Sequence, residues 1–282
     1  MKERIKQIIN TKHFHMIMVL IIIFTILFVV GVISLKYNVE GEGNLPFYIS
    51  KISTISNVEG IDVEDNTNKW NLQVNQNNDI YLYIKKNDKY NDTEIIKSVK
   101  LENFDIKENS KVGEIKLLKP DSNIESMIFK NIAENEVNSI EYIGDMESSI
   151  KEQKISKQGG LVVCRYAINN IGNYISNDEE EINHSNLLNK LNINNDDLKF
   201  KVTFDIYITL NSGKIYKSNI ELELPVNDVV NNGVQSTEYK DIDNIVFKRK
   251  WDKWDSQKMS HIFVEICWKN KLKNSKKDLL IW

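Results

Sequence analysis

Two patterns of hydrophobic residues divide the chain. Residues 16–35 form an unbroken apolar run, MIMVLIIIFTILFVVGVISL, without a charged residue. A helix of about 20 residues rises about 30 Å, which is the thickness of the hydrocarbon core of a bilayer. Beyond this run, alternation of apolar and polar positions dominates residues 37–249. The sequence therefore predicts one transmembrane helix followed by a mainly β region.

The clearest alternation lies at residues 200–210, FKVTFDIYITL. Apolar residues occupy every second position, which is typical of a half-buried strand. Residues 211–214, NSGK, have the composition of a turn, and residues 220–224 alternate again before Pro225. We predict an antiparallel hairpin here.

Other strand patterns are shorter. They lie at residues 47–55, 70–74, 80–84, 95–106, 112–118, 138–143 and 242–247. Residues 161–168 are apolar at both odd and even positions, which predicts a central strand covered on both faces. Short helices are expected at residues 121–134 and 184–191. We predict a mainly β fold, an antiparallel and immunoglobulin-like β-sandwich that forms one large or two small domains.

The distribution of charged residues along the chain predicts its domain organisation. Residues 36–247 contain 23 basic and 35 acidic residues, a net charge of -12, whereas residues 248–282 contain 10 basic and 4 acidic residues, a net charge of +6. Four of the five Trp residues lie in the second segment. We predict a basic cytoplasmic leader at 1–15, a transmembrane anchor at 16–35, β-sandwich parts at 36–155 and 156–249, and a poorly ordered, basic, Trp-rich tail at 250–282.

The charges around the apolar run predict its orientation. Residues 1–15 contain four basic residues and one acidic residue. The positive-inside rule therefore places the N-terminus in the cytoplasm and the following chain outside the cell membrane, which the chain crosses once. A cleaved signal peptide is the alternative, because residues 32–34, VIS, resemble a cleavage site. The length of the apolar run favours an uncleaved anchor.

Three segments carry a resemblance to a known group of proteins. They are YNVEGE at 37–42, LPF at 45–47 and DNIVFKR at 243–249. The chain resembles, over about residues 1–249, uncharacterised single-pass membrane-anchored extracytoplasmic proteins of Gram-positive bacteria. The resemblance implies a short cytoplasmic end, one anchor and an extracytoplasmic β domain, without an assigned activity. Members are expected to end soon after the last segment, whereas this chain continues for 33 residues.

The sequence contains no familiar catalytic or nucleotide-binding motif. Neither GxxxxGK[ST], GxGxxG, HExxH nor GxSxG is present. His184 and His261 have no ligand-like spacing to each other or to a cysteine. Cys164 lies in an apolar segment and is expected to be a buried thiol, with a disulfide to Cys267 as the alternative. We therefore expect no cofactor, and an enzyme is the less favoured class.

Two acidic segments are candidate calcium sites. The candidate ligands are Asp62, Glu64 and Asp65 in one segment and Asp178 and Glu179 in the other. Calcium binds six to eight oxygen atoms, and carboxylates supply them. Neither segment has the DxDxDG pattern, so solvated acidic loops are the alternative interpretation.

Exposed aromatic residues and the tail suggest binding. Tyr81, Tyr83, Tyr207 and Tyr216 could contact a sugar, although tyrosines on half-buried strands commonly pack in the core. The tail at 250–282 could contact the outer leaflet, bind an anionic wall polymer, or have no selected function.

Our leading hypothesis is a membrane-anchored extracytoplasmic binding or accessory protein without catalytic activity. Its expected partners are the lipid bilayer and a membrane or cell-wall component, and not nucleic acid. The alternative is an envelope protein that binds or hydrolyses cell-wall glycan, for which two carboxylates about 5–9.5 Å apart would favour hydrolysis. A signalling sensor is disfavoured because the predicted cytoplasmic end is short.

Overall fold

The computed structural model describes residues 12–63, 69–90, 93–121, 129–131, 138–146, 153–177, 181–239 and 245–250. The chain divides into two units, Met1–Asn44 and Leu45–Trp282.

The first unit contains the helix α2 (Lys12–Glu40). Its segment Met16–Glu40 is long and apolar enough to cross a membrane, by length and composition. The apolar helix predicted from the sequence is therefore confirmed, and it continues past the apolar run that ends at Leu35. An ion pair one helical turn apart, between Lys36 Nζ and Glu40 Oε2 at 3.6 Å, accompanies this extension.

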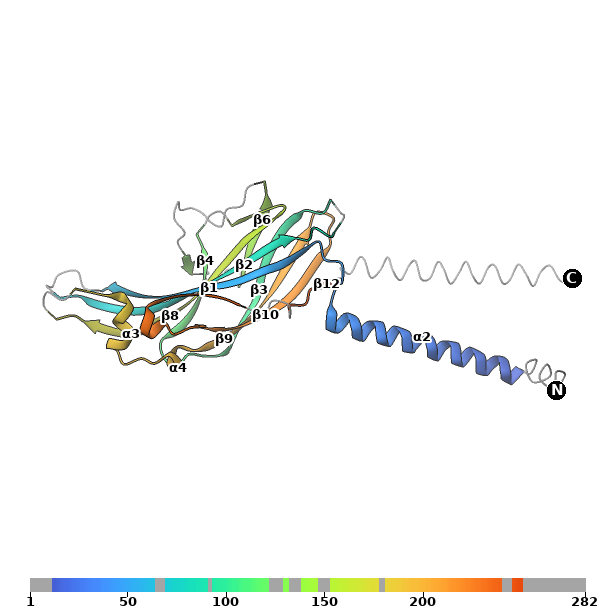
Figure 1. The fold of residues 1–282 in the computed structure, drawn as a ribbon, viewed down its shortest axis with the longest axis horizontal. Coiled ribbons are helices and arrows are strands. Elements are labelled where there is room, and N and C mark those ends of the chain that lie inside the picture. Colours follow the sequence, from blue (N-terminus) through green and yellow to red (C-terminus); the bar gives the residue numbers. More distant parts are fainter. Residues whose placement is uncertain are drawn as a thin grey trace. The chain divides into compact units, whose positions relative to one another are not determined.

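The second unit contains two six-stranded sheets (Figure 1). Sheet A consists, in spatial order, of β11 (Val234–Glu238), β1 (Phe47–Asp62), β2 (Asn71–Lys86), β8 (Gly159–Ile175), β4 (Glu114–Pro120) and β5 (Phe129–Asn131). Sheet B consists of β12 (Lys248–Lys250), β10 (Ile215–Leu224), β9 (Phe200–Leu210), β3 (Ile96–Glu108), β6 (Ser139–Asp145) and β7 (Lys154–Ser156). The described pairs are antiparallel except for β6 with β7. The predicted mainly β, largely antiparallel class is confirmed.

The described core is continuous between the two sheets. Tyr166 of β8 packs edge-to-face against Phe200 of β9, with ring centroids 6.0 Å apart, and against Phe104 of β3 at 6.3 Å. Each sheet takes strands from both sides of residue 155, and the predicted boundary between residues 155 and 156 falls inside the unit Leu45–Trp282. The described strands thus form one large two-sheet arrangement.

The predicted hairpin is confirmed. β9 and β10 pair in register from Phe200 opposite Leu224 to Thr209 opposite Ile215. Gly213 in the intervening turn has a φ of 85°, a conformation that glycine adopts without strain. The central strand predicted at 161–168 is also confirmed, because β8 lies between β2 and β4.

One tyrosine joins the two sheets. Tyr142 of β6 donates its hydroxyl hydrogen to the carbonyl oxygen of Val163 at 2.7 Å and accepts the Val163 N–H at 3.1 Å. β4 pairs with β8 only from Arg165 onward, so the hydroxyl binds a part of the β8 edge that β4 does not reach. It satisfies two buried backbone groups at once.

Short helices adjoin one end of the strands. They are η2 (His184–Asn186), α3 (Leu187–Lys190), α4 (Asn195–Leu198) and α5 (Val229–Asn232). Leu187, Leu188, Leu198 and Val229 of these helices are fully buried. The helical segment predicted at 184–191 is confirmed as η2 followed by α3.

Two other predictions need correction. In the segment 121–134, predicted as a helix, the described residues Phe129–Asn131 form strand β5, because their backbone pairs with β4. In the segment 242–247, predicted as a strand, residues 245–247 are not in a strand. There the Val246 carbonyl accepts the Ser218 hydroxyl at 2.9 Å, and the strand β12 starts at Lys248. Residues 251–282, most of the predicted tail, lie outside the described residues.

Candidate functional site

A hollow lies on the outer face of sheet A, across β11, β1, β2 and β8. Its volume is about 500 Å³, within the range of small-ligand sites. The strand register arranges the lining side chains in three adjacent rows. These are Ser236 and Ile55 in the first row, Glu238, Ser53 and Tyr81 in the second, and Lys51, Tyr83 and Leu161 in the third, with Thr237 at the β11 edge. We call this hollow the sheet A groove.

The groove exists because a small residue lies among large ones. Ser53 sits in the middle of the second row and is 9 % exposed. Its strand neighbours in the ladder, Glu238 on β11 and Tyr81 on β2, are both longer. Residues two apart on a strand share a face, so Lys51 and Ile55 flank Ser53 along β1. The serine therefore forms the floor, and the larger side chains form the walls.

An ion pair crosses the rim of the groove. Lys51 Nζ lies 2.8 Å from Glu238 Oε2 and 5.7 Å from the centroid of the Tyr83 ring. The hydrogen bond to Glu238 raises the pKa of Lys51. The rim thus offers a charged donor and a charged acceptor beside an aromatic face that is 36 % exposed.

The second tyrosine of the groove, Tyr81, is held by Asp79, its neighbour on the same face of β2. Tyr81 donates its hydroxyl hydrogen to Asp79 Oδ2 at 3.3 Å. Burial, together with the charge of Asp79, raises the pKa of Tyr81 to about 12, so the hydroxyl is neutral at physiological pH. Arg165 of β8 binds the same carboxylate through two guanidinium nitrogens, one of them at 2.9 Å. The ring of Phe129 covers the guanidinium with a centroid distance of 4.0 Å.

This arrangement suits a ligand with both apolar faces and many hydroxyl groups. Aromatic rings contact the C–H faces of such a ligand, while fixed polar groups orient it. Tyr81 and Tyr83 supply rings, and Lys51, Glu238 and the small hydroxyl side chains supply hydrogen-bond partners.

The four tyrosines considered from the sequence have different positions. The structure brings Tyr81 and Tyr83 together in the sheet A groove. Tyr216 lies in the core and is 4 % exposed. Tyr207 lies on the outer face of sheet B, where Lys217 and Lys250 cover its ring at 5.4 and 4.9 Å from the centroid.

A buried aspartate on sheet B was not anticipated from the sequence. Asp205 accepts hydrogen bonds from Asn103 at 2.7 Å and from Asn219 at 3.0 Å, and it pairs with Lys217 at 2.8 Å. Desolvation acts to raise the pKa of Asp205, but these hydrogen bonds outweigh it, so the pKa lies below its ordinary value. The satisfied carboxylate is a structural element of the sheet.

The calcium candidates are only partly described. Asp62 lies at the end of β1, where its Oδ1 accepts the Asn71 N–H at 3.3 Å. The other four candidates, Glu64, Asp65, Asp178 and Glu179, lie outside the described residues. Within the described ranges, no group of three or more His, Cys, Asp or Glu side chains could hold a metal ion.

The cysteine and histidine candidates have structural roles where they are described. Cys164 is a free, fully buried thiol, and burial raises its pKa. His184 accepts the Gly60 N–H at its Nδ1 atom, 3.0 Å away, and so joins η2 to β1. Cys267 and His261 lie outside the described residues.

Comparison with known proteins identifies no relative: no protein-family model, curated protein or solved structure matches this chain. The geometry of the sheet A groove therefore carries the functional argument without support from homology.

Proposed function

We propose that the protein is a membrane-anchored binding protein of the cell exterior. In this proposal α2 is an uncleaved anchor, the N-terminus is cytoplasmic, and the β unit is extracytoplasmic. The basic leader and the apolar helix support this orientation. We further propose that the two packed sheets belong to the immunoglobulin-like kind of β-sandwich.

The sheet A groove is the observation that supports binding. It combines two tyrosine rings, a rim ion pair and a serine floor on one rigid sheet. Functional groups on strands are held more accurately than groups on loops. We propose that the groove binds a carbohydrate of the cell wall, because a sugar ring presents C–H faces to aromatic rings and hydroxyls to fixed polar groups.

Binding is favoured over hydrolysis by the state of the nearby carboxylates. Glycoside hydrolysis uses two carboxyl groups, one of which donates a proton. Glu238 pairs with Lys51, and Asp79 is held by Arg165 and by the Tyr81 hydroxyl. Both carboxylates are already engaged with cations of the protein, an arrangement that suits recognition better than acid catalysis.

A binding measurement tests the proposal. Full-length protein in detergent is titrated with soluble cell-wall oligosaccharides, and the dissociation constants are measured by calorimetry. We expect Tyr83→Ala to weaken binding about tenfold, because losing an aromatic contact of about 1–1.5 kcal/mol has that effect. Trp70→Ala is the matched control, since Trp70 is 50 % exposed and is not part of the groove.

The result separates two kinds of partner. Equal affinity for the wild-type protein and Tyr83→Ala would remove the groove as the glycan site. If no oligosaccharide binds, crosslinking in the native membrane becomes the next measurement. Recovery of one dominant membrane protein would then favour an accessory subunit over a glycan-binding protein.

A further inference from the structure

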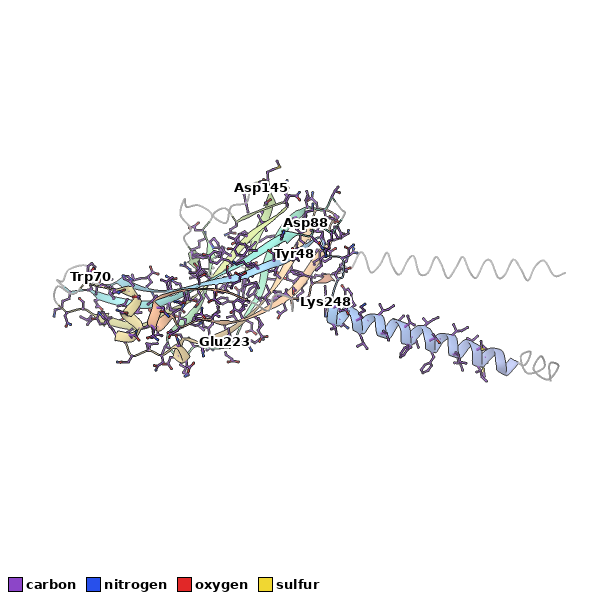
Figure 2. All side chains as sticks on the ribbon, viewed as in Figure 1. Tyr48, Trp70, Asp88, Asp145, Glu223 and Lys248 are labelled. Carbon is purple, nitrogen blue, oxygen red and sulfur yellow. The ribbon has the colours of Figure 1, made fainter. Side chains whose placement is uncertain are left out.

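One end of the β unit is basic although residues 36–247 carry a net charge of -12. We call it the linker end, because it contains Phe47, where β1 begins, and Lys250, where β12 ends. Six lysines gather there. They are Lys85, Lys86, Lys89, Lys97, Lys248 and Lys250. Figure 2 labels Asp88 and Lys248 at this end and Trp70 at the opposite end of the unit.

The strand register places the first three lysines at the linker end. Lys86 lies opposite Phe47 in the ladder between β1 and β2. Lys85 lies opposite Gly159, the first residue of β8. Lys89 follows in the turn after β2, where the Asn87 N–H donates to the Pro46 carbonyl at 2.8 Å.

Sheet B contributes the other lysines. Lys97 follows Ile96, which lies opposite Leu210 at the end of β9. Lys250 lies opposite Ile215, the first residue of β10. The basic end is therefore built by both sheets.

These lysines are not neutralised within the described chain. None of the six forms an ion pair with a described carboxylate, and Lys86 donates instead to Gln158 Oε1 at 3.0 Å. Carboxylates near this end have other partners: Lys214 pairs with Glu94 at 2.8 Å, and Lys154 pairs with Asp145 at 3.3 Å. Of the described residues among these lysines, Asp88 is the exposed acidic one.

The connection to α2 limits how far the linker end can be from a membrane. Five residues separate the end of the apolar run at Leu35 from Glu40, a rise of about 7 Å, which is about the thickness of the headgroup layer. Only residues 41–46 separate Glu40 from Phe47, and this length of chain spans at most about 25 Å.

We propose that the linker end binds the anionic phospholipid headgroups of the membrane that α2 anchors it to. This inference depends on the anchoring in the proposed function above. Cationic side chains near an anionic lipid surface are attracted to it, and the attraction fades within a Debye length. The contact fixes the orientation of the β unit and leaves the outer face of sheet A available to a ligand.

The test measures the distance of the linker end from lipid in the full-length protein. Ser212, exposed in the turn between β9 and β10, is changed to Cys and labelled with a fluorophore. Cys267→Ser removes the second cysteine from the labelling reaction, and Cys164 is buried. The protein is inserted into vesicles of phosphatidylcholine, with or without one third phosphatidylglycerol, that carry a quencher on the lipid headgroup.

We expect stronger quenching in the vesicles with phosphatidylglycerol. The difference should vanish in 1 M salt, where the Debye length is about 3 Å. Each lysine near an anionic surface favours contact about fivefold, so Lys85→Glu, Lys89→Glu and Lys97→Glu together should abolish the difference. A control with the same charge change at the opposite end, Lys107→Glu, Lys111→Glu and Lys199→Glu, should retain it.

Two outcomes separate this inference from the anchoring on which it depends. Equal quenching in both kinds of vesicle, by labelled protein that keeps all its lysines and resists carbonate extraction, overturns the lipid contact and leaves the anchor intact. Release of the protein by carbonate overturns the anchor and the lipid contact together. The lipid comparison uses the unmodified lysines, so it decides the question even if a charge-reversal variant folds poorly.

Discussion

Two buried tyrosines allow a matched test of how the sheets are joined. Tyr142 and Tyr166 are 0 % and 1 % exposed, so replacing either by Phe removes one hydroxyl from the core. The Tyr142 hydroxyl makes two hydrogen bonds to the Val163 backbone, at 2.7 and 3.1 Å. The Tyr166 hydroxyl is buried without a hydrogen-bond partner among the described residues. The same chemical change therefore has opposite expected consequences.

The expected change in the free energy of unfolding follows from the backbone groups that each substitution leaves without a hydrogen-bond partner. Tyr142→Phe leaves the buried N–H and C=O of Val163 unsatisfied, at about 1–3 kcal/mol each. We expect a loss of about 2–6 kcal/mol in the free energy of unfolding, which lowers the Tm of a unit of this size by about 4–24 °C. Tyr166→Phe removes a desolvated hydroxyl that gains nothing from folding, so it should be neutral or stabilising.

The assay is thermal and urea unfolding of the full-length protein in detergent, followed by circular dichroism of the β unit. Both variants create a void of the same size, so the difference between them isolates the hydrogen bonds. Equal destabilisation by the two variants would refute the assignment of the Tyr142 hydroxyl as the link between β6 and β8.

Three further predictions concern Asp205, Gly144 and Cys164. The pKa of Asp205 is lowered, so its ionised form stabilises the fold above about pH 4, and this stability is lost as the pH falls through the lowered pKa. Asp205→Asn should therefore make the Tm less dependent on pH in the acid range, measured as Tm against pH. Gly144→Ala would place a Cβ atom 2.1 Å from the Ile96 carbonyl oxygen and should lower the Tm clearly, whereas Gly43→Ala, with no atom within 4 Å, should not. Cys164 should react with a thiol reagent only after unfolding, since it is fully buried with a raised pKa; rapid reaction of the native protein would contradict its placement.

The sequence predicted the fold best where one strand face is continuously apolar. β9 alternates without interruption, β10 alternates over residues 220–224, and a turn with glycine joins them, so their faces and their pairing could be deduced. The segment containing Phe129 carried no such alternation, and its strand depends on pairing with β4, which is a tertiary contact. Tertiary contacts of this kind override the secondary-structure propensity of the local sequence.

A polar interruption in β2 shows a second limit. The sequence suggested separate strands at 70–74 and 80–84, because the polar residues NQNN lie between them. The structure continues one strand from Asn71 to Lys86. Gln76 and Asn78 are fully buried and bind each other through two hydrogen bonds, at 2.8 and 2.7 Å, while the Ser56 hydroxyl donates to Asn78 at 2.7 Å. Buried amides are tolerated when they satisfy one another, as Gln76 and Asn78 do along β2, and the third partner, Ser56, comes from β1 through the strand pairing, which the sequence of β2 alone does not show.

The sheet A groove lies beyond sequence reasoning for a related reason. Tyr81 and Tyr83 could be selected from the sequence as aromatic candidates, but nothing in the sequence around Ser53 or Glu238 marks these two as binding residues. They matter because the ladder places β11, β1 and β2 side by side in one register. A shift of one residue in any of these pairings would turn the groove residues toward the core. The groove is thus a property of strand register, and its test by Tyr83→Ala is also a test of that register.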